Sequence, residues 1–347
     1  MAQIDLSVIV PCYNEQESVC LTHERLTKTL SALSSQFEII YVNDGSTDDT
    51  GTLLRSIAAD DCRAKFVEFS RNFGQAAAIT AGLEFSRGSA VVIIDADLQD
   101  PPELIEDMVR LWHQGFDIIY GRRLSRDGET FLKKATAAAF YRILNRSSQT
   151  KLPIDVGEFR LMDRRVVQTL GRLNERHRYM RGLVSWLGYR QTSVDYHRGP
   201  RHAGATKYSV ERLVRVAGDA LFSFSVVPLR AAIWAGTVAA TLAIIGIAYA
   251  IVLRLFTDIW VSGWTLLFIG VAFFGGVQLV FLGVIGEYIG RIFFEVKQRP
   301  LYVISDGLGF DPELSERISR RVGPSPDRGA GDQKGPLQRS SRTDVHA

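Results

Sequence analysis

The chain has 347 residues, which is enough for a domain with a large core and a further part. Its 41 Lys and Arg nearly balance 38 Asp and Glu, so a net charge of +3 excludes a uniformly basic or acidic chain and says little about partners, which the local distribution of charge indicates better. No nucleic-acid partner is expected. Cys12, Cys20 and Cys62 lie in the first fifth without metal-type spacing, which indicates reduced thiols in a cytosolic environment. The N-terminus has no basic region before a long apolar run, so no signal peptide is expected.

The first 120 residues alternate short apolar runs, rich in Val and Ile, with stretches of helical composition. The runs are LSVIVP, FEIIYVN, KFVEF and AVVIID, and the helical stretches are Gln16–Leu33, Asp48–Ala59, Gln75–Ser86 and Pro102–Gln114. This alternation predicts βαβ units and an α/β fold with a mostly parallel sheet. Ligands of such sheets bind beyond the carboxyl ends of the strands. We therefore expect the polar segments PCYNE, NDGSTDD, SRNFGQ and DADLQD to face one crevice.

Carboxylates gather directly after the fourth run, where Asp95, Asp97 and Asp100 follow one another closely. Asp44 is expected in the same crevice. Converging carboxylates repel and raise one another's pKa, and a divalent cation relieves that repulsion. Mg²⁺ or Mn²⁺ typically takes one or two carboxylates together with substrate phosphate oxygens. We therefore expect a metal-dependent site at Asp95 and Asp97, and we expect Asp100, which two prolines follow, to cap the next helix.

Two uncharged apolar runs follow in the second half of the chain, Ala231–Leu253 and Ile259–Gly286. Each is long enough to cross the roughly 30 Å of hydrocarbon in a bilayer, whereas buried helices of soluble proteins rarely run so far without a polar face. Basic residues flank the pair on the outside: Arg230, Arg291, Lys297 and Arg299. The positive-inside rule then predicts a multi-pass protein of the cell (inner) membrane with its large N-terminal domain and both termini in the cytoplasm.

The segments on either side of these runs have different compositions. Ser209–Val227 carries apolar residues at helical spacing with arginines opposite, which predicts an interfacial helix on the membrane, or else an amphipathic helix packed on the domain. After Phe310 the sequence is rich in Ser, Gly, Pro, Asp and Arg, so we expect disorder from about residue 311.

The motifs VIVPCYNE, VNDGSTDDT and IDADLQDPPE stand in order over roughly residues 5–165 and resemble glycosyltransferase family 2. That family has the GT-A fold and uses nucleotide-sugar donors. YGRR at Tyr120–Arg123, GEFRLMDRR at Gly157–Arg165, RHAGATKYS at Arg201–Ser209 and the two apolar runs are similar to its polyprenyl-phosphate branch, which includes dolichol-phosphate mannose synthases and bactoprenol glucosyltransferases. Members of the branch commonly have Asp or a small residue where Glu158 stands here.

The resemblance implies a domain division and a set of site residues. The expected parts are a cytosolic GT-A domain, a juxtamembrane amphipathic helix, a two-helix transmembrane hairpin and a cytosolic C-terminal segment, at 1–208, 209–228, 229–299 and 300–347. The residues implied for nucleotide-sugar binding are Pro11, Tyr13, Glu15, Val42, Asp44, Asp95, Ala96, Arg201 and Lys207. Asp97 and Gln99 are implied for the metal. The candidates for the acceptor phosphate are Arg123, Lys133 and Lys134, and Asp97, Arg123, Asp155 and Glu158 are the candidate catalytic residues.

The charge of a lipid monophosphate indicates the chemistry. Its second pKa lies near ~6, so at neutral pH it is largely a dianion and a ready nucleophile, and no general base is required. Asp155 and Glu158 are then either a base, sugar-orienting groups, or ordinary acids of a loop and a strand edge. We expect one in-line displacement with inversion, from UDP-glucose to undecaprenyl phosphate by resemblance, with GDP-mannose or a modified UDP-sugar as alternative donors.

Other functions are weighed against this one. A processive polysaccharide synthase would carry a QxxRW stretch, but no tryptophan here follows an arginine. A membrane-bound nucleotide-sugar sensor or a lipid carrier is the non-enzymatic alternative, and a homo-oligomer is left open. A chain ending before Arg230 is expected to keep donor binding and to lose turnover of long-chain acceptor.

Overall fold

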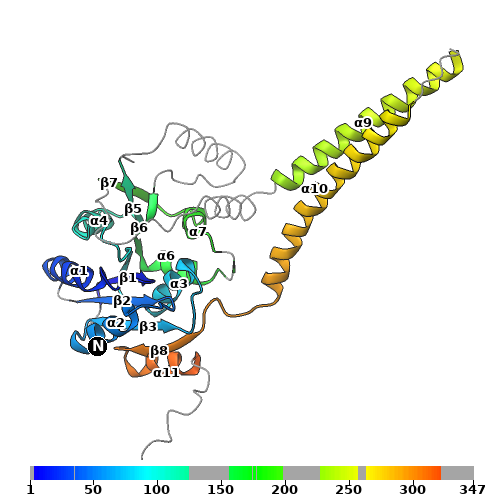
Figure 1. Ribbon diagram of the computed structural model, residues 1–347. Helices are drawn as coiled ribbons and strands as arrows, with labels where there is room; N and C mark the ends of the chain where they lie inside the picture. The colour runs from blue at the N-terminus through cyan, green and yellow to red at the C-terminus, as the bar shows by residue number, and fades with distance from the viewer. Residues whose placement is uncertain are drawn as a thin grey trace, which may run out of the picture.

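The computed structural model describes residues 4–34, 36–124, 156–173, 175–176, 178–197, 227–256 and 263–321. These residues form one eight-stranded sheet in the order β7-β5-β6-β4-β1-β2-β3-β8, shown in Figure 1. The strands are β1 (Leu6–Cys12), β2 (Phe37–Asn43), β3 (Ala64–Phe69), β4 (Ala90–Ile93), β5 (Ile118–Arg123), β6 (Val156–Asp163), β7 (Gln191–Tyr196) and β8 (Ile304–Leu308).

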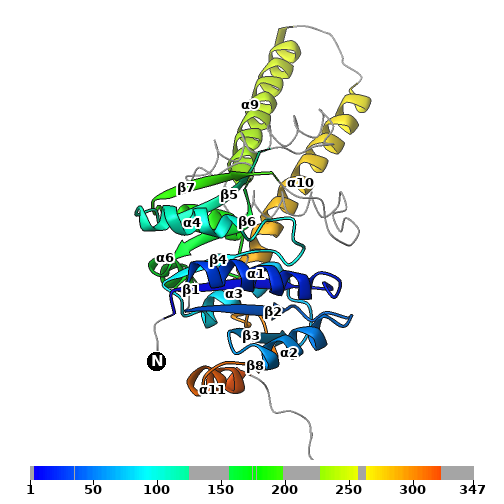
Figure 2. The ribbon, with the colours of Figure 1, turned by 90° about the vertical axis from the view of Figure 1, so that its left-hand side faces the viewer.

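Helices cover both faces of the sheet (Figure 2). The helices of the α/β domain are α1 (Val19–Leu33), α2 (Thr50–Asp60), α3 (Gln75–Phe85), α4 (Leu104–His113), α6 (Arg164–Gly171), α7 (Met180–Trp186) and α11 (Pro312–Arg321). Apolar side chains of α1, α2 and α4 pack on one face. Those of α3, α6, α7 and α11 pack on the other. The result is a three-layer α/β/α domain.

The four apolar runs predicted as strands are β1 to β4, and the order β4-β1-β2-β3 is parallel throughout. Every residue of β2 is buried, as expected of a β-branched run covered on both faces. β6 and β8 are antiparallel to their neighbours, so the sheet is mixed but mostly parallel, as predicted. The chain moves from β1 to β2 and β3 on one side and to β4 on the other. The switch point, where such sheets bind ligands, therefore lies at the carboxyl ends of β1 and β4.

The C-terminal segment returns to the sheet, which corrects two predictions. β8 pairs antiparallel with β3, and Leu314 and Ile318 of α11 are buried beside it. The prediction of disorder from residue 311 is therefore wrong up to Arg321, because these two residues are spaced four apart and give the polar segment one apolar helical face. The domain also includes residues after the predicted boundary at 208. Residues 322–347 and 209–226 lie outside the described part, so neither the tail nor the interfacial helix is tested there.

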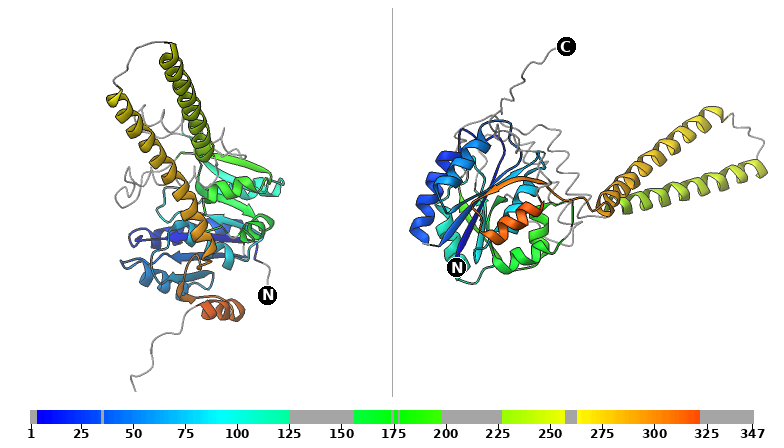
Figure 3. Two further views of the ribbon diagram at one scale, coloured as in Figure 1. Left: turned by 90° about the vertical axis from the view of Figure 1, so that its right-hand side faces the viewer. Right: turned by 90° about the horizontal axis from the view of Figure 1, so that it is seen from below.

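Two long helices, α9 (Val227–Phe256) and α10 (Trp264–Val296), project away from the domain as a hairpin (Figure 3). Among the described residues, one segment, Phe273–Val296 of α10, is long and apolar enough to cross a membrane. The helix continues past Gly286, where the uncharged run ends, to Val296, and Arg291 pairs with Glu287 one turn earlier at 3.0 Å. The described structure therefore gives one candidate span where the sequence predicted two.

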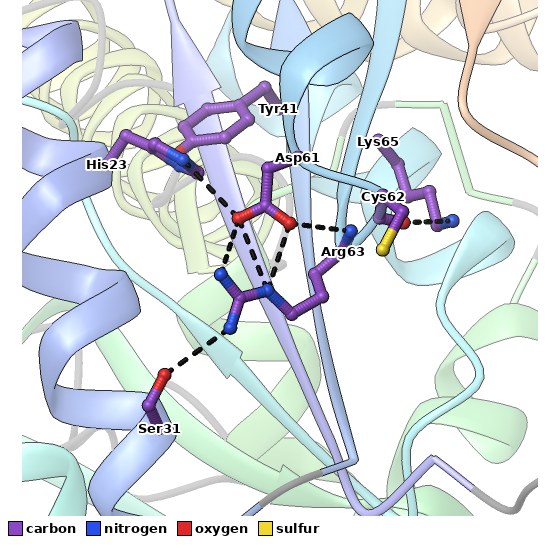
Figure 4. A network of polar contacts seen from close by, with 7 residues as sticks. All are labelled: His23, Ser31, Tyr41, Asp61, Cys62, Arg63 and Lys65. Atoms are coloured by element: carbon purple, nitrogen blue, oxygen red, sulfur yellow. Dashed lines mark hydrogen bonds and ion pairs between the residues drawn. The ribbon is translucent and has the colours of Figure 1, made fainter.

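A polar network joins α1 to the turn between α2 and β3 (Figure 4). The guanidinium of Arg63 donates to both carboxylate oxygens of Asp61, at 2.9 and 2.8 Å. His23 lies 3.6 Å from Asp61 and shares a hydrogen bond of 3.0 Å with Tyr41. The hydrogen bonds from Arg63 lower the pKa of Asp61, while burial lowers the pKa of His23. This network ties the first helix to β2 and to the turn before β3 on the same face of the sheet.

We expect Asp61→Asn to lower the free energy of unfolding by about 1 kcal/mol, since Arg63 is partly exposed and loses one charged partner. The folded-state pKa of Asp61 lies below the unfolded value, so its contribution is present above about pH 4 and is lost as the pH falls through the folded pKa. Unfolding of both proteins across a pH series measures this difference. Asp60→Asn, the same charge change at an exposed neighbour, is the control. An equal loss in both variants would contradict the prediction.

Candidate active site

The loops after β1 and β2 hold each other in place at the carboxyl edge of the sheet. Asn14, which has a left-handed φ of 54°, accepts from the backbone N–H of Thr47 at 2.8 Å. The Asn14 N–H donates to the hydroxyl of Ser46, and that hydroxyl donates to Asn43. Gly45 also has a left-handed φ, of 62°, and an added Cβ would lie 2.4 Å from the backbone of Arg71. Only glycine fits there, so the turn brings the two loops together.

The residues predicted to hold the nucleoside fall into two groups. Tyr13 is 37% exposed and Glu15 follows it in the loop, so both side chains lie at the surface of this edge. Val42 is buried in the core and could contact a ligand only through its backbone. The Asp44 carboxylate is buried and accepts from two backbone N–H groups of the loop before α3. Burial raises the pKa of Asp44 and those two bonds oppose it, so this residue fixes the loop.

The acidic group after β4 is built as a tight turn. Leu98 has a left-handed φ of 57°, and Asp97 accepts from the backbone N–H of Gln99 at 3.2 Å. The buried Ala96 is held through its carbonyl, which accepts from Thr22 at 2.9 Å. Gln75 donates to the half-buried Asp95 at 2.8 Å. Hydrogen bonds from Thr22 of α1 and Gln75 of α3 therefore hold this turn in place.

The acids of this turn interact strongly. Burial, followed by the carboxylates of Asp100, Asp97 and Glu158, raises the pKa of Asp95 to about 7. Such repulsion is the electrostatic condition that a divalent cation relieves. In the described part of the chain, no three His, Cys, Asp or Glu side chains form a complete metal cage. The carboxylate of Asp97 and the side-chain amide oxygen of Gln99 are of the ligand type that Mg²⁺ or Mn²⁺ takes together with substrate phosphates.

The prediction for Asp100 is wrong. The helix α4 begins at Leu104 with Glu103 at its N-cap position, so Asp100 lies outside the cap. The Asp100 side chain is 0% exposed and accepts a hydrogen bond from the hydroxyl of Tyr196. It also lies 3.6 Å from the guanidinium of Arg123. A buried carboxylate is costly unless it is paired, and these two distant partners explain its position.

Arg123 ends β5 at the same edge of the sheet, as the resemblance implies for a phosphate ligand. Its side chain is 17% exposed, and its Nε donates to Tyr196 at 3.1 Å. A Cβ added at Gly157 would lie 2.6 Å from its Nη2, so the guanidinium crosses directly over that glycine. Arg123 also opposes the rise in the pKa of Asp95, which shows that it faces the acidic group.

Glu158 is held between two arginines. The antiparallel register pairs Ile93 of β4 with Arg160 of β6, which brings Glu158 level with Asp95. Its two carboxylate oxygens accept from Arg160 at 2.6 Å and from Arg181 at 2.9 Å. Burial raises the pKa of Glu158, but the two arginines outweigh it and hold that pKa below its usual range. An ionised carboxylate with both oxygens occupied is a weak proton acceptor, so the geometry favours an orienting role over a base.

Five of the predicted residues lie outside the described part of the chain: Lys133, Lys134, Asp155, Arg201 and Lys207. Sequence reasoning missed four residues that contact predicted ones: Gln75, Arg160, Arg181 and Tyr196. The arginine-rich stretch GRLNERHRYMRGL was a signal for Arg181. Tyr196 had none, because its partner Asp100 lies 96 residues away.

This mixed sheet, with its acidic turn at the end of β4, defines an α/β glycosyltransferase fold of the GT-A type. The model of the family "Glycosyl transferase family 2" matches residues 7–171. An "Uncharacterized glycosyltransferase YkcC" of Bacillus subtilis (strain 168) is 44% identical over 89% of this chain and 95% of its own length. A "Prophage bactoprenol glucosyl transferase homolog" of Escherichia coli (strain K12) is 37% identical over 86% of this chain and 98% of its own length.

The chain therefore belongs to glycosyl transferase family 2, and the resemblance predicted from its motifs, including the polyprenyl-phosphate branch, is confirmed. Among solved structures, mannosyl-3-phosphoglycerate synthase from Rubrobacter xylanophilus has a TM-score of 0.43 at 17% identity, over 62% of this chain and 71% of that one. That likeness is too distant to carry an argument about ligands.

Proposed function

We propose that this glycosyltransferase moves a sugar from a nucleotide-sugar donor to the phosphate of a polyprenyl phosphate at the cytoplasmic face of the membrane. The observation that carries the proposal is the pairing of an acidic turn with a cation: the Arg123 guanidinium lies 3.6 Å from Asp100 and lowers the pKa of Asp95, at one edge of a domain that bears an exposed apolar hairpin. The relatives named as bactoprenol glucosyl transferases support the acceptor class. UDP-glucose and undecaprenyl phosphate are the proposed substrates.

Different residues would bind the two anionic substrates, the nucleotide sugar and the lipid phosphate. Asp97 and Gln99 would hold Mg²⁺ or Mn²⁺, which when bound offsets charge on the departing nucleoside diphosphate. Arg123 offers a planar fork of N–H donors to the acceptor phosphate. Tyr13, Glu15 and the backbone near Ala96 would contact the nucleoside, and Arg201 and Lys207 the diphosphate.

The reaction needs no protein base. A phosphate oxygen of the lipid, already ionised at neutral pH, forms a bond to the anomeric carbon while the bond from that carbon to the diphosphate breaks. The electron pair leaves with the nucleoside diphosphate, and the configuration at the anomeric carbon inverts. Glu158, held ionised by two arginines, would accept a hydrogen bond from a sugar hydroxyl.

The sheet topology supports two membrane crossings. Strands β1 to β7 precede the hairpin and β8 follows it, yet all lie in one sheet. A chain that leaves this domain through the membrane must therefore return to the same side, which requires an even number of crossings. Since α10 contains a segment that can cross, we propose α9 as the other crossing. Lys297 and Arg299 beyond α10 favour the cytoplasmic side for the domain.

The test incubates membranes containing the protein with a panel of radiolabelled nucleotide sugars and undecaprenyl phosphate. We expect label from UDP-glucose to become extractable into organic solvent with release of UDP, because the sugar alone is transferred; release of UMP would indicate transfer of a sugar phosphate. Extractable label from GDP-mannose or a modified UDP-sugar would change the donor and keep the reaction. Donor binding without extractable label from any sugar would favour the sensor or carrier. Membranes lacking the protein are the control.

A further inference from the structure

Three buried side chains form a hydrogen-bonded row at the carboxyl edge of the sheet: Asp100, Tyr196 and Arg123. They come from the turn after β4, the end of β7 and the end of β5. Arg123 and Tyr196 are direct partners in the parallel register of β5 and β7. The exposed fraction is 5% for Tyr196 and 0% for the Asp100 side chain, whereas the Arg123 side chain is 17% exposed. The arginine is therefore the end of the row that reaches the surface.

The direction of each hydrogen bond in the row is fixed. The Tyr196 hydroxyl donates to a carboxylate oxygen of Asp100. Burial and the Asp100 charge raise the pKa of Tyr196, which keeps that proton in place at neutral pH. The Tyr196 oxygen is left to accept from the Arg123 Nε at 3.1 Å. This contact sets the rotation of the guanidinium plane.

Close packing restricts the positions that the Tyr196 ring and the Arg123 guanidinium can adopt. The Tyr196 ring stands edge-on to Phe159, with ring centroids 6.1 Å apart. A Cβ added at Gly121 would lie 3.0 Å from that ring, and one at Gly157 would lie 2.6 Å from the Arg123 Nη2. Ring and guanidinium therefore have little freedom to move. Within the described part of the chain, Arg123 donates a hydrogen bond through Nε, and its Nη2 lies 3.6 Å from Asp100, which is an ion pair without a hydrogen bond. The Nη groups therefore have N–H donors to offer a ligand.

We propose that Tyr196, backed by Asp100, is a positioning residue that orients Arg123 so that its Nη groups present a fork to the phosphate of the lipid acceptor. The inference rests on the proposed function, which gives Arg123 that ligand. Orienting one donor removes a conformational cost that binding would otherwise include, and a misplacement of about 1 Å at such a site can lower the rate ~10²-fold.

The test is Tyr196→Phe, which keeps the ring and removes the hydroxyl. We expect kcat/KM for undecaprenyl phosphate to fall about tenfold or more, as for a lost hydrogen bond to a charged group, while KM for the nucleotide sugar changes less than about twofold. Tyr302→Phe is the matched control, since Tyr302 is also buried and also donates to a carboxylate, that of Glu84 at the opposite end of the sheet. It should leave both kinetic constants unchanged.

A double-mutant cycle with Arg123→Lys separates positioning from a structural role. Lysine lacks the Nε–H, so adding Tyr196→Phe to Arg123→Lys should lower kcat/KM for the lipid by less than about twofold more. Additive losses, or a Tyr196→Phe enzyme with wild-type kinetics, would overturn the inference. If the wild-type protein transfers no sugar to undecaprenyl phosphate, the proposed function itself fails.

Discussion

Replacing Asp97 with alanine is expected to reduce sugar transfer by at least about 10²-fold while leaving the fold intact. Asp97 lies in the turn after β4, where its carboxylate accepts from the Gln99 backbone and is not part of the buried core. Its removal leaves Asp95 and Asp100 in place but takes away the oxygen proposed to hold the cation beside the donor diphosphate. The loss should therefore fall on turnover and on metal-dependent donor binding, with little change in unfolding.

Two measurements check this expectation. Transfer is followed with the radiolabelled donor, and Mn²⁺ binding in the presence of UDP is followed by electron paramagnetic resonance. Asp107→Ala is the control, because that acid is on α4 and forms only a surface ion pair with Arg110. Wild-type transfer by Asp97→Ala, or full activity after exhaustive chelation, would contradict the metal assignment. A variant that loses transfer but still moves lipid across the bilayer would indicate a carrier.

The sequence predicts best the elements that consist of one short apolar run, because such a run is buried whatever its neighbours are. β1, β2 and β4 are apolar runs rich in Val and Ile between turn residues, and all three are buried on both faces apart from the half-buried Pro11. β8 and α11 are different. ISDGL and PELSERISRR hold few apolar residues, and they are ordered because β3 offers an unpaired edge far away in the sequence.

The same distinction holds at the candidate site. The motifs locate the acidic turn, because they place Asp95, Asp97 and Asp100 directly after a buried strand. The prediction for Asp100 fails, because an acid followed by two prolines is also the typical local pattern of a helix N-cap. Its true partner, Tyr196, is fixed only by the pairing of β5 with β7. Glu158 is similar, because Arg181 reaches it from a separate helix.

The hairpin of α9 and α10, proposed to enter the membrane, is the basis of the second prediction with a large effect. Ending the chain before Arg230 was expected from sequence to spare donor binding, but it would also remove β8 and α11. The core would then lose Tyr302, Ile304, Leu314 and Ile318, all buried against β3 and α3. At about 1.5–3 kcal/mol for each buried side chain, the loss is on the order of 5 kcal/mol or more, comparable to the total stability of many domains. That truncation is expected to unfold the domain and so cannot test anchoring.

A sharper variant replaces residues 227–296 with a flexible Gly/Ser linker and keeps Lys297–Arg321. We expect this variant to have the same free energy of unfolding as the full chain and the same affinity for UDP, because every strand of the sheet remains. Turnover of undecaprenyl phosphate in vesicles should fall at least about 10²-fold, since the lost anchor no longer raises the effective concentration of the domain at the membrane surface. Turnover of a short, water-soluble polyprenyl phosphate should change less than about threefold, since Arg123 and the acidic turn are untouched. Equal losses on both acceptors would indicate that the hairpin shapes the catalytic site, and unchanged turnover on both would remove the reason for placing that site at the bilayer.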